Sequence, residues 1–328
     1  MNASPFALRR RHLLALGAAA ALPEGGQAQA RYPDRPISLL VPFAPGGIAD
    51  ITARVVAEQL TRSLGQPVVV ENKPSAGSIV ASQAVATAKP DGHTLLLMSN
   101  GNAVSVGLFK KLPFDPLKDF SPISTLGSFD IGLFVSANSR FTSLKDVVVF
   151  AKANPGKLNL GSIAVGSTQH LAAKLFETVA GIDTLVVPYK GSPAVVTALR
   201  TGEIDLAFEI VGPMLPQVQA GVVRALAVSS GVRNPALPDV PTVAQAGVAA
   251  YDVASWNAIA APAGTPPEVV AVLNRAVRDA VASPSVQDKL RKLGMRLGAG
   301  SPAELHGLLA SEIQRWGAVI KAAKIDPE

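Results

Sequence analysis

Three loops rich in glycine, serine and threonine carry the residues with the clearest chemistry in this chain of 328 residues. They span residues 42–50, 99–103 and 161–170, and each follows a predicted strand and precedes a predicted helix. Glycine lets the backbone approach a ligand closely, and the free N–H groups at a helix start favour an anion. The loops together predict an anion site built mainly from backbone amides. Its candidate ligand-binding residues are Phe43, Gly46, Gly47, Ala49, Asp50, Asn100, Gly101, Asn102, Ala103, Ser162, Gly166, Ser167, Thr168 and His170.

Each single loop also fits a second interpretation, in which its glycines and serines serve only turns and helix caps. Asp50 lies in the first turn of a predicted helix, where it either caps that helix or orients the amides of the loop. Tyr189 and Lys190 follow a strand and open a helix, so Lys190 is either an anion partner or a solvated turn residue. Glu209 ends a strand and either accepts hydrogen bonds from an amino or hydroxyl group of the ligand or pairs with a base. His170 either lines the site or packs beside it.

Catalytic and metal chemistry find little support in the sequence. It contains no G-x-S-x-G nucleophile motif, and no G-x-G-x-x-G follows the first strand. Residues 161–168 have the spacing of a phosphate loop, but Ser167 stands where the lysine belongs. The chain has no cysteine, and its histidines lack partners at metal-binding spacing. We therefore predict a protein that is not an enzyme, with no catalytic residue, no metal and no cofactor. A secreted enzyme, such as a phosphatase or a hydrolase, is the competing class.

Short runs of β-branched residues, which predict strands, alternate with amphipathic helices. These strands and helices must hold the three loops in position. The order predicts an α/β fold with a mostly parallel sheet covered by helices on both faces. The predicted strands are 37–41, 68–71, 94–98, 132–136, 158–161, 184–188, 204–209, 224–228 and 259–261. The predicted helices are 49–64, 79–88, 143–154, 168–180, 193–201, 267–283 and 302–324, with Thr142 or Ser143 capping the third and Thr265 the sixth.

The first thirty residues have the order of a secretory signal peptide. A positive segment with three arginines precedes an apolar run at 13–22, and Ala28-Gln29-Ala30 is a small-residue cleavage site. We expect cleavage near Ala30 and a periplasmic mature chain, with the choice between the general and the twin-arginine export routes left open. No later apolar run is long enough to span a bilayer.

The composition is that of a globular protein with a mild positive charge. Hydrophobic residues make up 48% and charged residues 16%, and the formal net charge is +6. Aromatic residues make up only 5%, and the basic residues form no block. Because nucleic-acid binding needs clustered basic and aromatic residues, we expect no nucleic-acid partner. A mild positive field suits an anionic ligand.

Seven segments, in order along nearly the whole mature chain, resemble the substrate-binding proteins of tripartite tricarboxylate transporters, also called Bug receptors. They are YPDRPI (32–37), VPFAPGG (41–47), VVVENKP (68–74), KPDGHTLL (89–96), LPFDPLKDF (112–120), VPYKG (187–191) and LPDVPTV (237–243).

The resemblance implies a type II periplasmic-binding-protein fold, with two α/β lobes joined by two hinge strands and the ligand cleft between them. We expect lobe 1 to comprise residues 31–131 and 253–328, and lobe 2 residues 132–252. In this family the loop matching 43–50 holds a ligand carboxylate, and the loops matching 100–103 and 162–168 complete the pocket. The implied partners are a small carboxylate and membrane permease subunits, and we expect a monomer.

Two positions depart from the family pattern. Ile48 stands where small residues are common, and Glu209 stands where aspartate is more frequent. The ligand therefore stays open among dicarboxylates, tricarboxylates, amino acids and aromatic acids. An orphan receptor or a sensory partner of a membrane kinase also agrees with the same fold.

Overall fold

Strand β4 (Phe120–Ser136) passes through both halves of the molecule and organises the fold. Up to Asp130, β4 pairs antiparallel with β9 (Ala254–Pro262). From Ile131 on, it pairs with β7 (Leu206–Ile210) in a second sheet. We call the half built on the first sheet lobe 1 and the half built on the second sheet lobe 2. The computed structural model describes residues 1, 32–249, 251–322 and 325–327.

Lobe 1 contains a mixed sheet in the order β2-β1-β3-β9-β4, and β10 (Met295–Leu297) also pairs with β4. Strand β1 (Ile37–Val41) is parallel to β2 (Val68–Asn72) and to β3 (Thr94–Ser99). Four of the five residues of β1 are buried, which is expected for a parallel strand with helices on both faces of the sheet. Strand β9 is antiparallel to both β3 and β4.

Lobe 2 contains the order β4-β7-β5-β6, and β8 (Val223–Val228) pairs antiparallel with β4. Strand β5 (Asn159–Ile163) is parallel to β6 (Leu185–Tyr189) and to β7. The carboxyl ends of these parallel strands therefore meet at one edge of the sheet, where α/β proteins place ligands.

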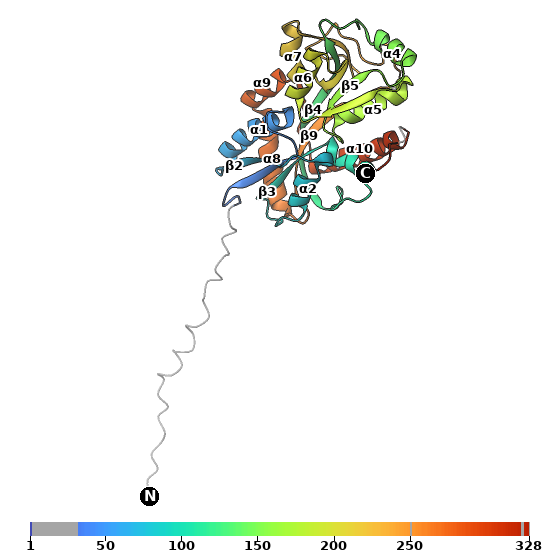
Figure 1. Cartoon of the computed structure of the whole chain (residues 1–328). Coiled ribbons are helices and arrows are strands. Elements are labelled where there is room, and N and C mark those ends of the chain that lie inside the picture. The colour runs from blue at the N-terminus through green and yellow to red at the C-terminus, as the bar shows by residue number, and fades with distance from the viewer. Residues whose placement is uncertain (2–31, 250, 323–324, 328) are drawn as a thin grey trace.

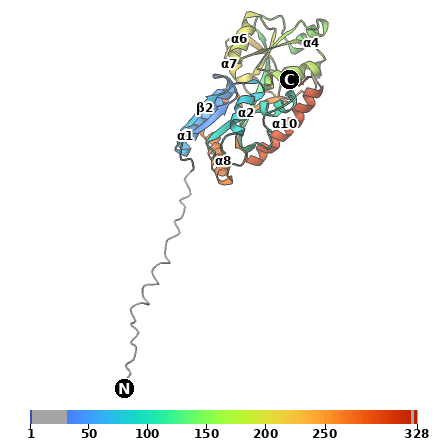
Figure 2. The ribbon, with the colours of Figure 1, turned by 60° about the horizontal axis from the view of Figure 1, so that its bottom comes forward.

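The chain returns from lobe 2 to lobe 1 beside β4. The backbone N–H of Ser229 donates to Ile131 at 2.8 Å, and the N–H of Val253 donates to Ser229 at 2.9 Å. Figure 1 shows β4 and β9 between the two lobes, and the rotated view in Figure 2 keeps α4, α6 and α7 at one end and α1, α2 and α8 at the other. The predicted α/β class and the two crossing strands are confirmed. The predicted mostly parallel sheet is wrong, because five of the nine strand pairings in the described residues are antiparallel and all five involve β4 or β9.

The helices cover both sheets and follow local sequence signals. Helix α4 begins with a capping box in which Ser143 accepts from the N–H of Asp146, and α1 and α5 end at left-handed Gly65 and Gly181. The helical elements are α1 (Ile48–Leu64), η1 (Ala76–Ser78), α2 (Ile79–Ala86), α3 (Asn100–Leu108), α4 (Leu144–Ala153), α5 (Thr168–Ala180), α6 (Ser192–Thr201), α7 (Val211–Gln219), α8 (Pro267–Ala282), α9 (Pro284–Lys292) and α10 (Pro302–Ala322).

Several elements differ from the sequence prediction. Strand β4 begins at Phe120, twelve residues before the predicted strand, and α3, α7, α9 and β10 were not predicted. The N-cap of α8 is Pro266, not Thr265, whose hydroxyl instead donates to the carbonyl of Pro262 at 2.7 Å. The predicted signal peptide lies outside the described residues apart from Met1. Among the described residues, no helix is both long and apolar enough to cross a membrane.

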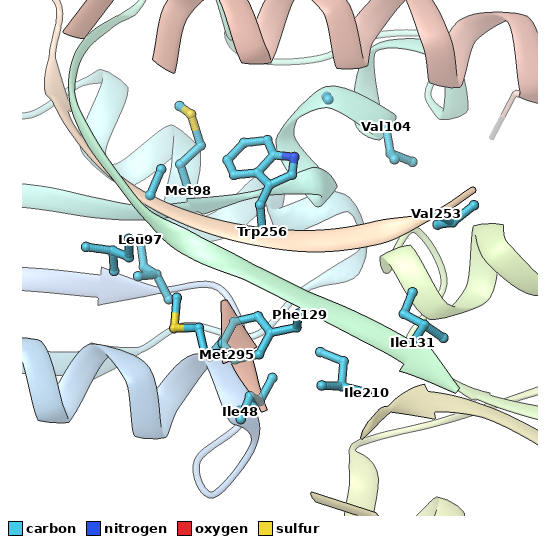
Figure 3. Close-up of a cluster of buried hydrophobic side chains, with 14 of the residues drawn as sticks. Ile48, Leu97, Met98, Val104, Phe129, Ile131, Ile210, Val253, Trp256 and Met295 are labelled. Carbon is cyan, nitrogen blue, oxygen red and sulfur yellow. The ribbon is translucent and has the colours of Figure 1, made fainter. Parts of the chain in front are cut away.

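The hydrophobic core continues across both lobes through the crossing strands. Phe129 of β4 and Trp256 of β9 are buried on opposite sides of β4 in Figure 3. This placement follows from the pleat, because Trp256 is opposite Ser128 in the register of the two strands, one residue before Phe129. Full burial of a side chain as large as phenylalanine stabilises the fold by about 1.5–3 kcal/mol.

Candidate functional site

A cavity of about 470 Å³ lies where strand-to-helix loops of the two lobes face each other, and we call it the interlobe cleft. Both crossing strands also contribute to its wall. The lining residues are Pro42, Phe43, Ala44, Pro45, Gly47, Ile48, Ala49, Pro74, Ser75, Ala76, Ser99, Phe129, Ile163, Ala164, Ser167, Thr168, Gln169, Lys190, Gly191, Ser192, Pro193, Ile210, Ser255 and Asn257.

The start of α1 presents backbone N–H groups to the interlobe cleft without a side-chain cap. Gly47 is the N-cap residue, and its carbonyl accepts the first helical bond from Ile51 at 3.0 Å. Within the described part of the chain, the N–H groups of Ile48, Ala49 and Asp50 have no protein acceptor. Unpaired amides and the positive end of the helix dipole favour an anion, and a carboxylate fits this end.

Asp50 braces the loop that leads into α1. Its carboxylate accepts hydrogen bonds from the N–H of Gly46 at 2.9 Å, from Arg54 at 3.0 Å and from the side chain of Asn72 at 2.9 Å. The same amide of Asn72 donates to the carbonyl of Phe43 at 3.0 Å. Burial opposes the ionisation of Asp50, but these bonds outweigh it, so its pKa lies below the ordinary value. Asp50 holds the loop in place but does not line the cleft.

Lobe 2 presents a second helix start, that of α5. Ser167 caps this helix by accepting from the N–H of His170 at 3.1 Å. Thr168 Oγ1 lies 3.2 Å from Ser255 Oγ on β9, so a hydrogen bond links α5 to a crossing strand. The backbone N–H groups of Thr168 and Gln169 have no hydrogen-bond acceptor among the described residues. The starts of α1 and α5 therefore face one cavity from two lobes.

The loop before α6 places a positive charge at the interlobe cleft. Lys190 is exposed and lines the cavity, and the N-cap of α6, Gly191, has no side-chain cap. Tyr189 does not line it, and its hydroxyl donates to Glu203 at 2.8 Å. Burial and this carboxylate raise the pKa of Tyr189 to about 12, so its hydroxyl is a neutral donor.

Glu209 lies behind the wall of lobe 2 and holds two lining residues. Its Oε1 accepts from the side chain of Gln169 at 3.0 Å and from the N–H of Ile210 at 2.8 Å. Full burial raises the pKa of Glu209, although these hydrogen bonds partly oppose the shift. Its Oε2 is buried and has no partner among the described residues.

Comparison with known protein families identifies the family of this chain. A family model described as the tripartite tricarboxylate transporter family receptor, TctC, matches residues 52–325. The chain belongs to this family. Protein BugT of Bordetella pertussis is 37% identical over 292 residues, which are 88% of this chain and 90% of BugT.

Solved structures of the TctC family share the fold. Rpa4515 of R. palustris, solved with adipate, is 36% identical and has a TM-score of 0.86 over 90% of this chain and 100% of that chain. MatC of Rhodopseudomonas palustris, solved with bound malate, is 32% identical and has a TM-score of 0.83 over 88% of this chain and 100% of that chain. The predicted resemblance and the predicted two-lobed binding-protein fold are confirmed.

The loop predicted at 100–103 forms the first turn of α3 and is buried. Ser99 and Asn102 form a capping box, and the side chain of Asn102 donates to Ser82 at 2.7 Å. The side chain of Asn100 donates to the carbonyl of Ala254 at 3.1 Å. These bonds engage Asn102 and the side-chain N–H of Asn100 inside lobe 1, whereas Asn100 Oδ1 is buried without a partner among the described residues. The structure places Asn100, Gly101, Asn102 and Ala103 outside the lining.

Of the predicted residues, the structure brings Phe43, Gly47, Ala49, Ser167, Thr168 and Lys190 together in the lining. Besides the residues of α3, those placed outside the lining are Gly46, Asp50, Ser162, Gly166, His170, Tyr189 and Glu209. The side chain of His170 is largely buried, and this burial together with Lys174 lowers its pKa to about 4, so it is neutral at pH 7. Their roles as ligand contacts stay predictions.

Sequence reasoning missed two groups of lining residues. Pro74, Ser75 and Ala76 follow β2 and precede α2, so the strand-to-helix signal used for the other loops also applies to them. Phe129 and Asn257 lie on crossing strands and carry no local signal, because only the long-range pairing of β4 with β9 brings them to the cleft. Among the described residues, no three histidine, aspartate or glutamate side chains gather as metal ligands.

Proposed function

We propose that this protein is a periplasmic receptor that closes its two lobes around a small organic carboxylate. In this proposal it delivers the ligand to the permease subunits of a tripartite tricarboxylate transporter. The observation that carries the proposal is the pair of amide-bearing helix starts, α1 and α5, that face one cavity from opposite lobes. Lys190 adds a positive charge at the same cavity. Relatives solved with adipate and with malate support a carboxylate ligand.

In the proposed motion of a monomeric protein, residues 31–131 and 253–328 move as one rigid body. Residues 132–252 move as the other. The passage of β4 from one sheet to the other between Asp130 and Ile131 supports a hinge at this point. A ligand that contacts both lobes binds the closed state better than the open one, and this difference drives closure.

We propose a binding role and not catalysis. The hydroxyls of Ser167 and Thr168 bond to the carbonyl of Ile163 and to Ser255, so neither is paired with a base. His170, the histidine nearest to them in sequence, does not line the interlobe cleft. A hydrolase needs a nucleophile and a base within hydrogen-bond reach.

The test is calorimetric and thermal-shift titration of the mature chain, unfolded and refolded first to remove any ligand from the host. We expect one class of organic carboxylate to raise the stability by about 2.7 kcal/mol at a hundredfold excess over Kd. Gly47→Ala places a methyl group at the N-cap that faces the cleft, where the nearest protein atom lies 3.7 Å away, so the fold tolerates it. We expect this variant to lose at least tenfold in affinity, about 1.4 kcal/mol.

Gly307→Ala, in open space on α10, is the matched control and keeps the affinity. Refolded protein that binds no carboxylate would contradict the proposal, as would turnover of a carboxylate ester that Ser167→Ala abolishes.

A further inference from the structure

A groove on lobe 1, separate from the interlobe cleft, is rich in arginine, and we call it the arginine groove. It has a volume of about 700 Å³, and none of its lining residues lines the interlobe cleft. Its lining comes from α8, from α9 and from the segment 297–299 at the end of β10. The arginine groove therefore lies outside the site assigned to the carboxylate.

Helical spacing brings basic side chains together in the arginine groove. Arg275 and Arg278 are three residues apart and project from one face of α8, and Arg291 comes from α9. All three are exposed. Leu297 and Ala299 are half-buried and add apolar surface to the same groove.

The guanidinium groups of the arginine groove have no partner among the described residues, unlike most arginines of this protein. Of the twelve arginines in the described residues, eight bond to a carboxylate or amide or carbonyl oxygen or lie over an aromatic ring. The other four are the three arginines of the groove and Arg200. On α9, Lys289 and Lys292 are both in ion pairs, whereas Arg291 is in none with a described residue.

The carboxylates near the arginine groove do not neutralise it. Three arginines and one aspartate, Asp279, give the lining a net charge of +2. Glu304 lies outside the lining, and its carboxylate accepts from the N–H of Ser301 at 2.6 Å and from the hydroxyl at 2.9 Å. These bonds lower the pKa of Glu304, and Arg278 makes a smaller contribution to the shift.

An acidic peptide segment has the chemistry that matches this groove. The planar guanidinium group binds a carboxylate through two parallel hydrogen bonds, and arginine is enriched at protein interfaces. Arginines on two helices suit a chain that carries several acidic side chains, with apolar side chains between them for Leu297 and Ala299. A bilayer surface fits less well, because helices that lie on membranes present aromatic or large apolar residues beside their basic ones. The lining contains no aromatic residue.

The segment between α9 and β10 also contacts lobe 2. A Cβ on Gly212 of α7 would overlap the carbonyl oxygen of Leu293, so the two backbones pack directly against each other. Arg296 of β10 forms an ion pair with Asp130, which also accepts from the side chain of Asn234 in lobe 2 at 2.8 Å. A partner in the arginine groove therefore binds beside a segment that contacts both lobes.

We infer that the arginine groove is a docking surface for an acidic segment of a protein partner. The identity of this partner rests on the proposed function, in which it is a membrane subunit of the transporter. Acidic side chains of the segment bind Arg275, Arg278 and Arg291, and its apolar side chains cover Leu297 and Ala299.

The test measures the binding of labelled octapeptides to the refolded mature chain by fluorescence anisotropy at low ionic strength. In one set, aspartate or glutamate alternates with alanine, valine or leucine, and in the matched set each acid is replaced by its amide. We expect acidic peptides to bind at least about tenfold more tightly than their amide forms. Added salt weakens this binding, because exposed charges are screened.

The double variant Arg275→Gln, Arg278→Gln removes two positive charges from the arginine groove. We expect it to lose at least about tenfold in affinity for the acidic peptides. Arg200→Gln combined with Lys145→Gln removes two exposed positive charges from lobe 2 and is the matched control, which keeps the peptide affinity. Carboxylate affinity stays native in both double variants, because the arginine groove and the interlobe cleft share no lining residue.

Equal binding of the acidic and amide peptides would overturn the inference, as would equal peptide affinity in the two double variants. Binding to vesicles of phosphatidylglycerol and phosphatidylcholine that only the groove variant loses, with its peptide affinity unchanged, would assign the arginine groove to a lipid surface and also overturn it. Refolded protein that binds the acidic peptides but no carboxylate would overturn the proposed function and leave the docking surface in place.

Discussion

At the scale of single residues, the carboxyl group of Glu209 makes the stability of the fold depend on pH at the wall of the cleft. Burial raises the pKa of this carboxyl group, so the folded state keeps a proton that the unfolded state releases above about pH 4.3. The stability that this proton contributes is fully present below that pH and is lost as the pH rises toward the raised pKa. Because the group accepts hydrogen bonds from the side chain of Gln169 and from the N–H of Ile210, its ionisation acts directly on the wall of lobe 2.

Glu209→Gln keeps an acceptor oxygen for Gln169 and for Ile210 but cannot titrate. We expect the free energy of unfolding of the native chain to fall relative to this variant as the pH rises from 5 to 8. The difference grows by up to about 1.4 kcal/mol per pH unit where Glu209 is protonated in the folded state and ionised in the unfolded state. Urea unfolding at a series of pH values measures it. Parallel profiles for Glu209→Gln and the native chain would refute the assignment.

At the scale of elements, the start of α1 depends on one carboxylate. Asp50→Ala removes the acceptor shared by Gly46, Arg54 and Asn72. We expect this change to lower the free energy of unfolding by about 1–3 kcal/mol, because the N–H of Gly46 and the side-chain amide of Asn72 lose their partner in partly buried hydrogen bonds. Carboxylate binding weakens as well, because the loop that carries the amides of α1 loses its brace.

Urea unfolding and calorimetry give the two quantities for Asp50→Ala. Glu58→Ala, which removes exposed ion pairs from the same helix, is the control and leaves carboxylate affinity unchanged. An Asp50→Ala protein with native stability and native carboxylate affinity would show that the hydrogen bonds of Asp50 do not hold the loop before α1 in place.

Elements with a strong local pattern could be predicted from the sequence, and elements that depend on distant partners could not. Strand β1 is apolar except for Ser38, and α5 has clear cap and stop signals. The first part of β4 is interrupted by Pro122 and Gly127, and it is a strand because β9 and β10 pair with it. Helix α7 contains Pro213 and Pro216, which argue against a helix in the sequence.

The same distinction applies to the interlobe cleft. The β1–α1 and β5–α5 loops were predicted because their glycines and helix starts are adjacent in sequence. The contributions of Phe129, Ser255 and Asn257 follow only from the pairing of strands far apart in the chain.

At the scale of the whole molecule, the lobes meet across the cleft at two glycines. A Cβ on Gly166 of lobe 2 would lie 3.1 Å from the backbone nitrogen of Gly77 and 3.2 Å from a methyl carbon of Leu108, both in lobe 1. Gly166→Ala therefore hinders closure, and overpacking of this kind costs about 1–3 kcal/mol. We expect about a tenfold loss of carboxylate affinity, measured by calorimetry.

Gly181→Ala is the matched control for backbone strain. Gly166 has a φ of 79° and Gly181 a φ of 62°, so alanine is strained at both positions, but no atom lies within 4 Å of a Cβ on Gly181. We expect both variants to lose stability and only Gly166→Ala to lose affinity. Equal affinities in the two variants would show that the glycine contact does not limit closure.

The position of β9 has a consequence for the order in which the chain assembles. Strand β9 fills the place between β3 and β4, yet all of lobe 2 separates it from β4 in the sequence. While the chain is being synthesised, the sheet of lobe 1 therefore stays incomplete until nearly four-fifths of the residues have left the ribosome. Such late, long-range pairing makes folding slow. A chain that completes its sheet this late stays unfolded for longer, which agrees with the general export route, one of the two routes that the sequence leaves open.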